Sequence, residues 1–269
     1  MPCARAHAFV GDVATAASLL EATVADAGPD RGARIRALVA AARVLEERYR
    51  FEAASGFLGR AVRESPDDPE LAVRWIESLL EAGRAAEAGD AATQVASRLP
   101  ALSRDLAKRL VRRGATAQAG ALATALAATG VREDLDAAVS IHVGNKDRPA
   151  AVEAVRRFTT AGAPEGRLER ARVGVDVLDR QGLAREASEL FEQVLGSLAT
   201  AAASDLELLG TLMLRGDRAE PARAVLARAF EAAGRSLDAG LRLADLWTRH
   251  QAPRQAADVL RAVREVPPE

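Results

Sequence analysis

The chain has 269 residues, 49% of them hydrophobic, with 37 basic and 38 acidic residues and a formal net charge of −1. This balance gives the chain no general attraction to nucleic acid or to an anionic membrane surface. Cys3 is the only cysteine, which excludes an intrachain disulfide and a thiolate metal cluster.

The N-terminal residues, MPCARAHAFVGDVATAASLL, lack the continuous apolar core of a signal peptide. No apolar run in the chain approaches the roughly 18 residues that span a bilayer. We therefore expect a cytoplasmic protein that has neither a membrane nor a nucleic acid among its partners.

An alanine recurs along the chain in the same local pattern. Its eight positions are Ala16, Ala54, Ala88, Ala119, Ala151, Ala187, Ala222 and Ala256. Subtracting successive positions gives gaps of 38, 34, 31, 32, 36, 35 and 34 residues. A period of roughly 20–50 residues is typical of stacked copies of one helical unit. The alternative, an alanine-rich helical bundle, has no reason to hold this period over eight copies.

The first copies of the unit differ in completeness. The copy around Ala16 keeps only its second helix, over residues 11–27. The copy around Ala54 is the clearest, in the segment FEAASGFLGRAVRESPDDP that begins at Phe51. Its apolar residues fall at helical spacings on one face, which predicts a second helix that ends at Pro66. We expect a methyl group at Ala54 because the two helices of a unit cross closely.

The later copies follow the same order of helix, turn and helix. Residues 69–100 contain a first helix that Gly83 ends and a second helix that Pro100 ends. Other inter-helix glycines are expected at Gly114, Gly182 and Gly216. Gly216 lies one residue further from its alanine than the other glycines do. Lys146 stands where these copies have glycine. Residues 159–166, TTAGAPEG, form the loosest linker and predict a bend or a boundary between two sub-arrays.

This pattern resembles the tetratricopeptide repeat, whose unit is a pair of antiparallel helices with a small residue at the inter-helix turn. The resemblance implies an all-α, right-handed solenoid of stacked helix pairs. We expect one array over residues 1–269 with about seven and a half repeats. In this family the first helix of each unit lines a concave groove that binds peptides or partner proteins.

One cluster of basic residues falls on such a first helix, in SRDLAKRLVRRG from Ser103 to Gly114. Arg104, Lys108 and Arg112 are spaced four apart, so they share one stripe, and alignment to the family places this stripe in the groove. Arg43 and Glu77 align to the same groove. These five residues are the candidate partner-binding site. The stripe predicts a site for an anion or an acidic peptide, and the alternative is a solvated basic face.

The sequence offers no catalytic or metal constellation. His7, His142 and His250 lie in distant repeats, so we interpret them as isolated surface or helix-end residues. The catalytic motifs of zinc proteases, serine hydrolases and P-loop nucleotidases are absent. The segment GNKDRP at 144–149 shares only one glycine and one lysine with a phosphate-binding loop. It falls at an inter-helix turn, so we do not interpret it as such a loop. We therefore expect no enzyme activity, no metal and no cofactor.

The predicted function is a non-enzymatic protein–protein interaction scaffold that holds a peptide or partner protein in its groove. The alternative is a ligand- or peptide-sensing module of a larger bacterial regulatory protein. The array opens on a half-unit, and no polar capping helix follows Val263. Either the chain is a segment of a longer protein or its ends are covered by a partner, and uncapped ends also favour self-association. The sequence does not identify the partner.

Overall fold

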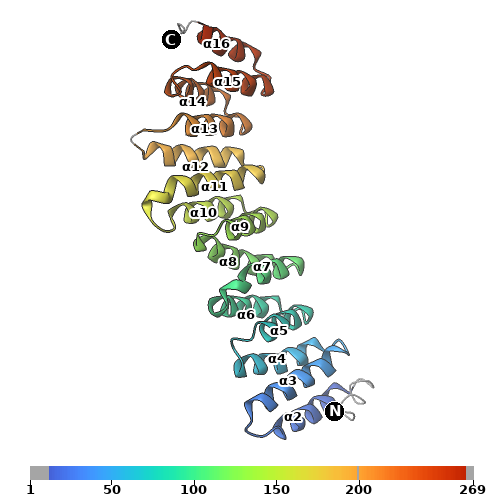
Figure 1. The fold of residues 1–269 in the computed structure, drawn as a ribbon. Helices are drawn as coiled ribbons and strands as arrows, with labels where there is room; N and C mark the ends of the chain where they lie inside the picture. The colour runs from blue at the N-terminus through green and yellow to red at the C-terminus, as the bar shows by residue number, and fades with distance from the viewer. Residues whose placement is uncertain (1–11, 199, 265–269) are drawn as a thin grey trace. The chain divides into compact units, whose positions relative to one another are not determined.

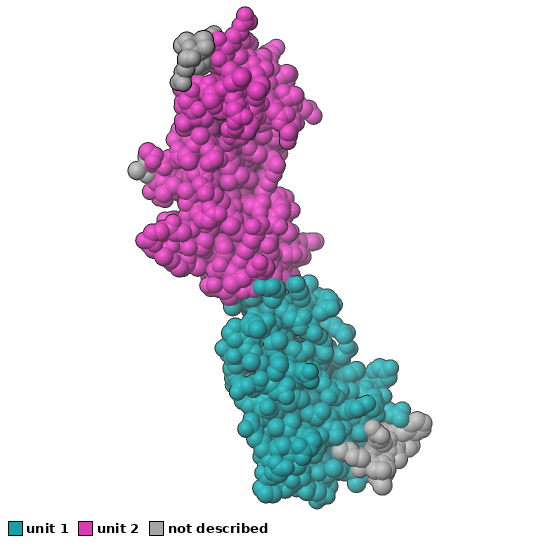
Figure 2. Space-filling view, in the orientation of Figure 1, with its two compact units in different colours: residues 1–126 teal, residues 127–269 magenta. Residues whose placement is uncertain are grey.

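The computed structural model describes residues 12–198 and 200–264, and in these ranges all regular secondary structure is helical. The chain folds as two compact units, residues 1–126 (unit 1) and residues 127–269 (unit 2) (Figure 2). The linker at 159–166 lies inside unit 2, where the short 3-10 helix η3 (Pro164–Gly166) leads into the next helix. A single array with a boundary at this linker stays a prediction.

Unit 1 alternates second and first helices. Its first helices are α3 (Arg31–Glu46), α5 (Pro69–Glu81) and α7 (Ser103–Arg112), the last preceded by the 3-10 helix η1 (Pro100–Leu102). Its second helices are α2 (Val13–Ala25), α4 (Phe51–Glu64), α6 (Ala85–Arg98) and α8 (Thr116–Leu126). Each helix packs against the next one along the chain (Figure 1).

Unit 2 repeats this arrangement after the 3-10 helix η2 (Ala127–Thr129). Its first helices are α9 (Arg132–Gly144), α11 (Arg167–Arg180), α13 (Ala203–Arg215) and α15 (Leu237–Arg249). Its second helices are α10 (Arg148–Thr160), α12 (Ala184–Gly196), α14 (Ala219–Ala232) and α16 (Pro253–Arg264). The predicted all-α architecture of stacked helix pairs is confirmed.

Each recurring alanine is the fourth residue of a second helix. The side chains of seven of them are 0% exposed, and that of Ala256 is 6% exposed. The amide of each alanine donates the first α-helical hydrogen bond to the residue before its helix, as Ala54 does to Arg50 at 3.0 Å. The buried methyl lets the first turn of a second helix approach its neighbours closely.

The turn between the two helices of a pair has one residue in the left-handed conformation, five positions before the alanine. The residues and their φ angles are Tyr49 (57°), Gly83 (75°), Gly114 (75°), Lys146 (61°), Gly182 (75°), Asp217 (57°) and Gln251 (56°). The next amide bonds back to the first helix, for example Arg84 to the Leu79 carbonyl at 2.9 Å. This is the Schellman pattern of helix termination. Lys146 thus occupies the position that the sequence predicted.

The prediction for Gly216 is wrong in its detail. Asp217, not Gly216, is the left-handed residue, so the five-residue spacing to Ala222 is kept. A Cβ atom at Gly216 would lie 2.7 Å from the Cα atom of Arg185, at the start of α12. The glycine at this position therefore permits a close approach between two backbones.

Replacing a recurring alanine by leucine is expected to destabilise the stack. Ala222→Leu adds three carbon atoms to a site with no exposed surface, which should lower the free energy of unfolding by about 1–3 kcal/mol through overpacking. Ala224→Leu, at an exposed position two residues later in α14, is the matched control and should change it by less than about 0.5 kcal/mol. Urea denaturation followed by circular dichroism measures both, and equal effects would contradict the role of the buried methyl.

Candidate binding surface on the first helices

Helix α7 is amphipathic, and its two faces have different roles. Leu106, Ala107 and Leu110 are fully buried against the neighbouring helices. Most of the remaining residues are charged, which leaves the opposite side of the helix to solvent. The packed side fixes α7 within unit 1, so the charges on its other side are held on a rigid element.

The structure places the three basic residues of the predicted stripe on this helix with different exposure. Lys108 and Arg112 are exposed, whereas Arg104 is half-buried. In the part of the chain that the structure describes, neither Lys108 nor Arg112 forms an ion pair or hydrogen bond through its side chain. The two are one helical turn apart, so they form one exposed cationic pair.

The other two candidate residues already have charged partners within the chain. Arg43, on α3, is exposed and lies 3.4 Å from Glu47, one turn later. Glu77, on α5, is half-buried and accepts from Arg109 of α7. Glu77 therefore joins two first helices, and the cationic pair is the part of the candidate site that stays unpartnered.

Ion pairs join successive first helices throughout unit 1. Arg74 of α5 lies 2.5 Å from Glu46 of α3. Arg109 bridges Glu77 and its own helix's Asp105, whose carboxylate it reaches at 2.7 Å. The hydrogen bond to Asp105 and the charge of Glu77 raise the pKa of Arg109 above its ordinary value.

Arg113, at the C-terminal end of α7, pairs in the same way with Glu81 of α5. The basic residues of this segment thus fall into two groups. Arg109 and Arg113 pair with carboxylates of unit 1, whereas Lys108 and Arg112 are exposed. The sequence interpretation missed the structural role of Arg109, although its spacing of four residues from Asp105 is a signal for such a pair.

Unit 2 has a corresponding series of ion pairs between its first helices. The pairs are Arg132–Asp176 (2.9 Å), Arg180–Asp136 (3.2 Å), Arg172–Asp205 (2.8 Å), Arg215–Asp179 and Arg242–Glu207 (3.4 Å). They join α9 to α11, α11 to α13 and α13 to α15. Most of these side chains are partly exposed, so each such pair contributes at most about 1 kcal/mol.

Asp205 is the exception because its side chain is only 3% exposed. Arg172 binds it through two parallel hydrogen bonds, from Nε at 2.8 Å and from Nη2 at 3.1 Å. Arg172 also donates to Glu169 at 2.9 Å. The hydrogen bond to Asp205 raises the pKa of Arg172 well above its ordinary value, so the guanidinium stays charged.

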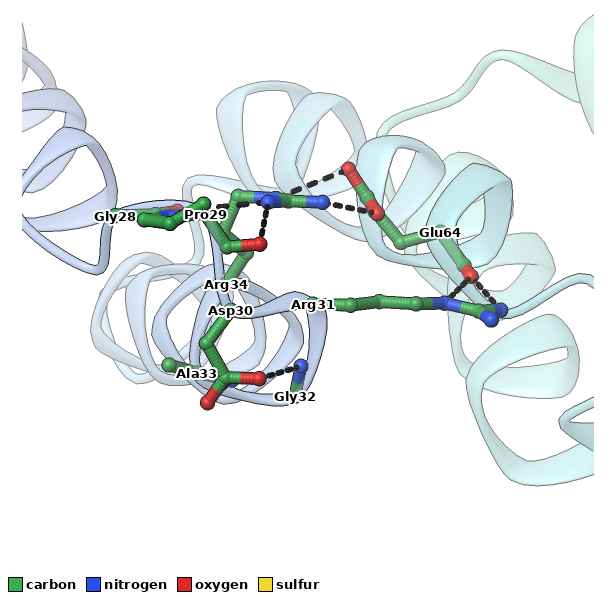
Figure 3. A network of polar contacts seen from close by, with 8 residues as sticks. All are labelled: Gly28, Pro29, Asp30, Arg31, Gly32, Ala33, Arg34 and Glu64. Atoms are coloured by element: carbon green, nitrogen blue, oxygen red, sulfur yellow. Dashed lines mark hydrogen bonds and ion pairs between the residues drawn. The ribbon is translucent and has the colours of Figure 1, made fainter.

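A second polar network joins α3 to the end of α4 (Figure 3). Arg31 Nε donates to the Glu64 carbonyl at 2.6 Å, at the C-terminal end of α4 where carbonyls lack helical partners. Arg34 donates to both carboxylate oxygens of Glu64, at 3.3 and 2.9 Å, and to the Pro29 carbonyl at 2.7 Å. The hydrogen bond from Arg34 lowers the pKa of Glu64. These groups satisfy one another, so the network is structural.

The two histidines in the described residues lie on different helices, His142 in α9 and His250 at the end of α15. His142, near the end of α9, is 4% exposed, so the interpretation as a helix-end residue is right but a surface position is wrong. Burial lowers the pKa of His142. His250 caps the end of α15, and His7 lies outside the described residues. No group of three or more possible metal ligands occurs within residues 12–198 and 200–264.

The segment at 144–149 contains the last residue of α9, the turn and the first two residues of α10, and thus includes the inter-helix turn that the sequence predicted. Lys146 is the left-handed residue of that turn. None of the helices in the described ranges is both long and apolar enough to cross a membrane.

The chain matches no family model and no curated protein sequence. Among solved structures it is similar to residues 41 to the end of MamA from Desulfovibrio magneticus RS-1, with 19% identity, 61% of this chain and 92% of that chain covered, and a TM-score of 0.34. A tetratricopeptide repeat protein from Parabacteroides merdae ATCC 43184 has 13% identity, coverage of 87% and 94%, and a TM-score of 0.31. The P58(IPK) TPR domain has 15% identity, coverage of 99% and 92%, and a TM-score of 0.28.

Tetratricopeptide repeat proteins are thus among the solved structures to which the chain is similar. These likenesses are distant in both sequence and TM-score, so the architecture is established by the helix pairs of this chain itself.

Removing the arginine partner of Asp205 is expected to destabilise unit 2. Arg172→Ala leaves a buried carboxylate without its counterion, which should lower the free energy of unfolding by about 3 kcal/mol. Arg242→Ala, which removes an exposed arginine from the same series, should cost less than about 1 kcal/mol. Urea denaturation compares the two variants, and a cost for Arg172→Ala no greater than that of the control would contradict the importance of the buried pair.

Proposed function

We propose that this chain is a non-enzymatic protein–protein interaction scaffold that binds an acidic peptide or an acidic segment of a partner protein on α7. The observation that carries this proposal is the exposed, unpartnered pair of Lys108 and Arg112. Three nearby carboxylates, on Glu77, Glu81 and Asp105, are engaged by Arg109 and Arg113. The charge that remains available on this surface is therefore positive.

The neighbouring residues support a peptide rather than a free anion as the ligand. Val111, between the two cations, is 38% exposed and offers an apolar contact. Two exposed ion pairs contribute together only about 1–2 kcal/mol, so measurable affinity needs further contacts along several helices. A stack of first helices supplies such an extended surface, and its rigidity lowers the entropy cost of binding.

The test is a selection of displayed random peptides of about 12 residues on the immobilised full chain, followed by fluorescence anisotropy of the selected peptides. We expect enrichment of peptides with Asp and Glu, and Lys108→Glu/Arg112→Glu should weaken their binding by about tenfold or more. Arg63→Glu/Arg98→Glu is the matched control, because it makes the same charge change at exposed positions on the second helices of unit 1. It should weaken binding much less.

The proposal fails if the selected peptides are not acidic, or if the Lys108/Arg112 double variant and the control bind them equally well. Circular dichroism of both double variants confirms that an effect on binding does not come from unfolding.

A further inference from the structure

Helix α14 in unit 2 separates two pockets. The larger, of about 710 Å³, lies between α12, α13 and α14. The smaller, of about 250 Å³, lies between α14, α15 and α16. Ala227 and Glu231 line both pockets, so the two adjoin across α14.

The small side chain of Ala227 explains why the pockets adjoin. Ala227 follows the recurring alanine Ala222 by five positions. The equivalent residues of the other second helices in unit 2 are Arg156, Glu192 and Arg261, whose long side chains cover more of the helix surface. On α14 the side chain at this position is a methyl group, which leaves the helix surface between the two pockets uncovered.

Apolar side chains line part of both pockets. Leu195, Leu209 and Val225 line the larger one, and Phe230, Trp247 and Val259 line the smaller one. Such a surface gains free energy from apolar side chains that enter it. The two pockets lie on opposite sides of one helix, and packed helices are about 8–10 Å apart, so we estimate a similar distance between the pockets. Residues seven apart on an α-helix are separated by about this distance, so one partner helix can place a side chain in each pocket.

The rim of the two pockets has an excess of unpartnered positive charge. Its carboxylates are engaged: Glu192 lies 3.0 Å from Arg218, Glu231 lies 2.7 Å from Arg235, and Asp258 lies 3.0 Å from Arg261. Two arginines of α14 are exposed instead, Arg223 beside the smaller pocket and Arg228 beside the larger. Within the described ranges neither guanidinium pairs with another side chain. Each pocket therefore has one available cation.

We propose that this surface of unit 2 binds an acidic amphipathic helix of a partner protein. Its apolar side chains enter the pockets on the two sides of α14, and its carboxylates pair with Arg223 and Arg228. This site is separate from Lys108 and Arg112, because it is formed by residues of unit 2, whereas Lys108 and Arg112 belong to unit 1. A surface with both apolar side chains and a charged rim favours such a partner over a purely acidic one.

The test uses the full chain with the Lys108→Glu/Arg112→Glu background, so that the α7 surface does not contribute. The probe is a fluorescent helical peptide of about 16 residues with leucines on one face and glutamates on the other. A second peptide carries lysines in place of the glutamates. We expect the acidic peptide to bind and the basic one to bind at least about tenfold more weakly.

Two variants in this background locate the binding. Ala227→Trp places a large side chain between the two pockets, and Arg223→Glu/Arg228→Glu reverses the charge of their rim. Each of these variants should weaken binding of the acidic peptide by about tenfold or more. Ala224→Trp is the control, because Ala224 is exposed on the same helix but lines neither pocket. It should bind like the background chain.

Three results would overturn the proposal. The first is no binding of the acidic peptide up to about 1 mM, and the second is equal binding by the Ala227→Trp and Ala224→Trp variants. The third comes from analytical ultracentrifugation: a dimer that Ala227→Trp converts to a monomer would show that a second copy of the chain covers the surface. None of these outcomes bears on Lys108 and Arg112 of the first proposal.

Discussion

The close packing of each second helix at its fourth residue is the constraint on which the rest of the structure depends. A buried methyl at this position sets how near the first turn of the helix approaches its neighbours, and the left-handed residue five positions earlier sets where that turn begins. Because both features recur in every pair that the structure describes, the pairs stack with similar geometry within each unit. First helices then follow one another closely enough for their charged side chains to meet.

This stacking divides the charged residues into two groups. Arginines such as Arg109 and Arg172 reach carboxylates of adjacent first helices and stabilise the stack. Others, including Lys108 and Arg223, project from exposed positions without a partner in the described ranges. The chain is nearly neutral overall, yet the internal ion pairs leave local surfaces on α7 and α14 with available positive charge. Binding in both proposals comes from these unpaired cations, next to apolar contacts that the packing leaves open.

The repeat could be predicted from the sequence because it is local. Alanine spacing and the turn residue depend on a few adjacent positions, so all eight alanines were placed correctly on second helices. The assignment of the turn at Gly216 failed because that glycine is required by contact with Arg185, about one repeat away in sequence. For the same reason the sequence could not show which cation of α7 pairs with Glu77. Lys108 and Arg109 are adjacent in sequence, and only the packing of α7 against α5 shows that Glu77 contacts Arg109. The pockets beside Ala227 likewise depend on three helices at once.

Hydrogen–deuterium exchange of the full chain, with and without an acidic peptide selected on it, tests most directly whether binding and packing use different residues. The account predicts slower exchange in α7 on binding, while the amides of the recurring alanines, which are already hydrogen-bonded, stay unchanged. Unchanged exchange in α7, together with new protection at the alanine positions, would contradict it, because binding would then act on the packing of the stack rather than on its exposed cations.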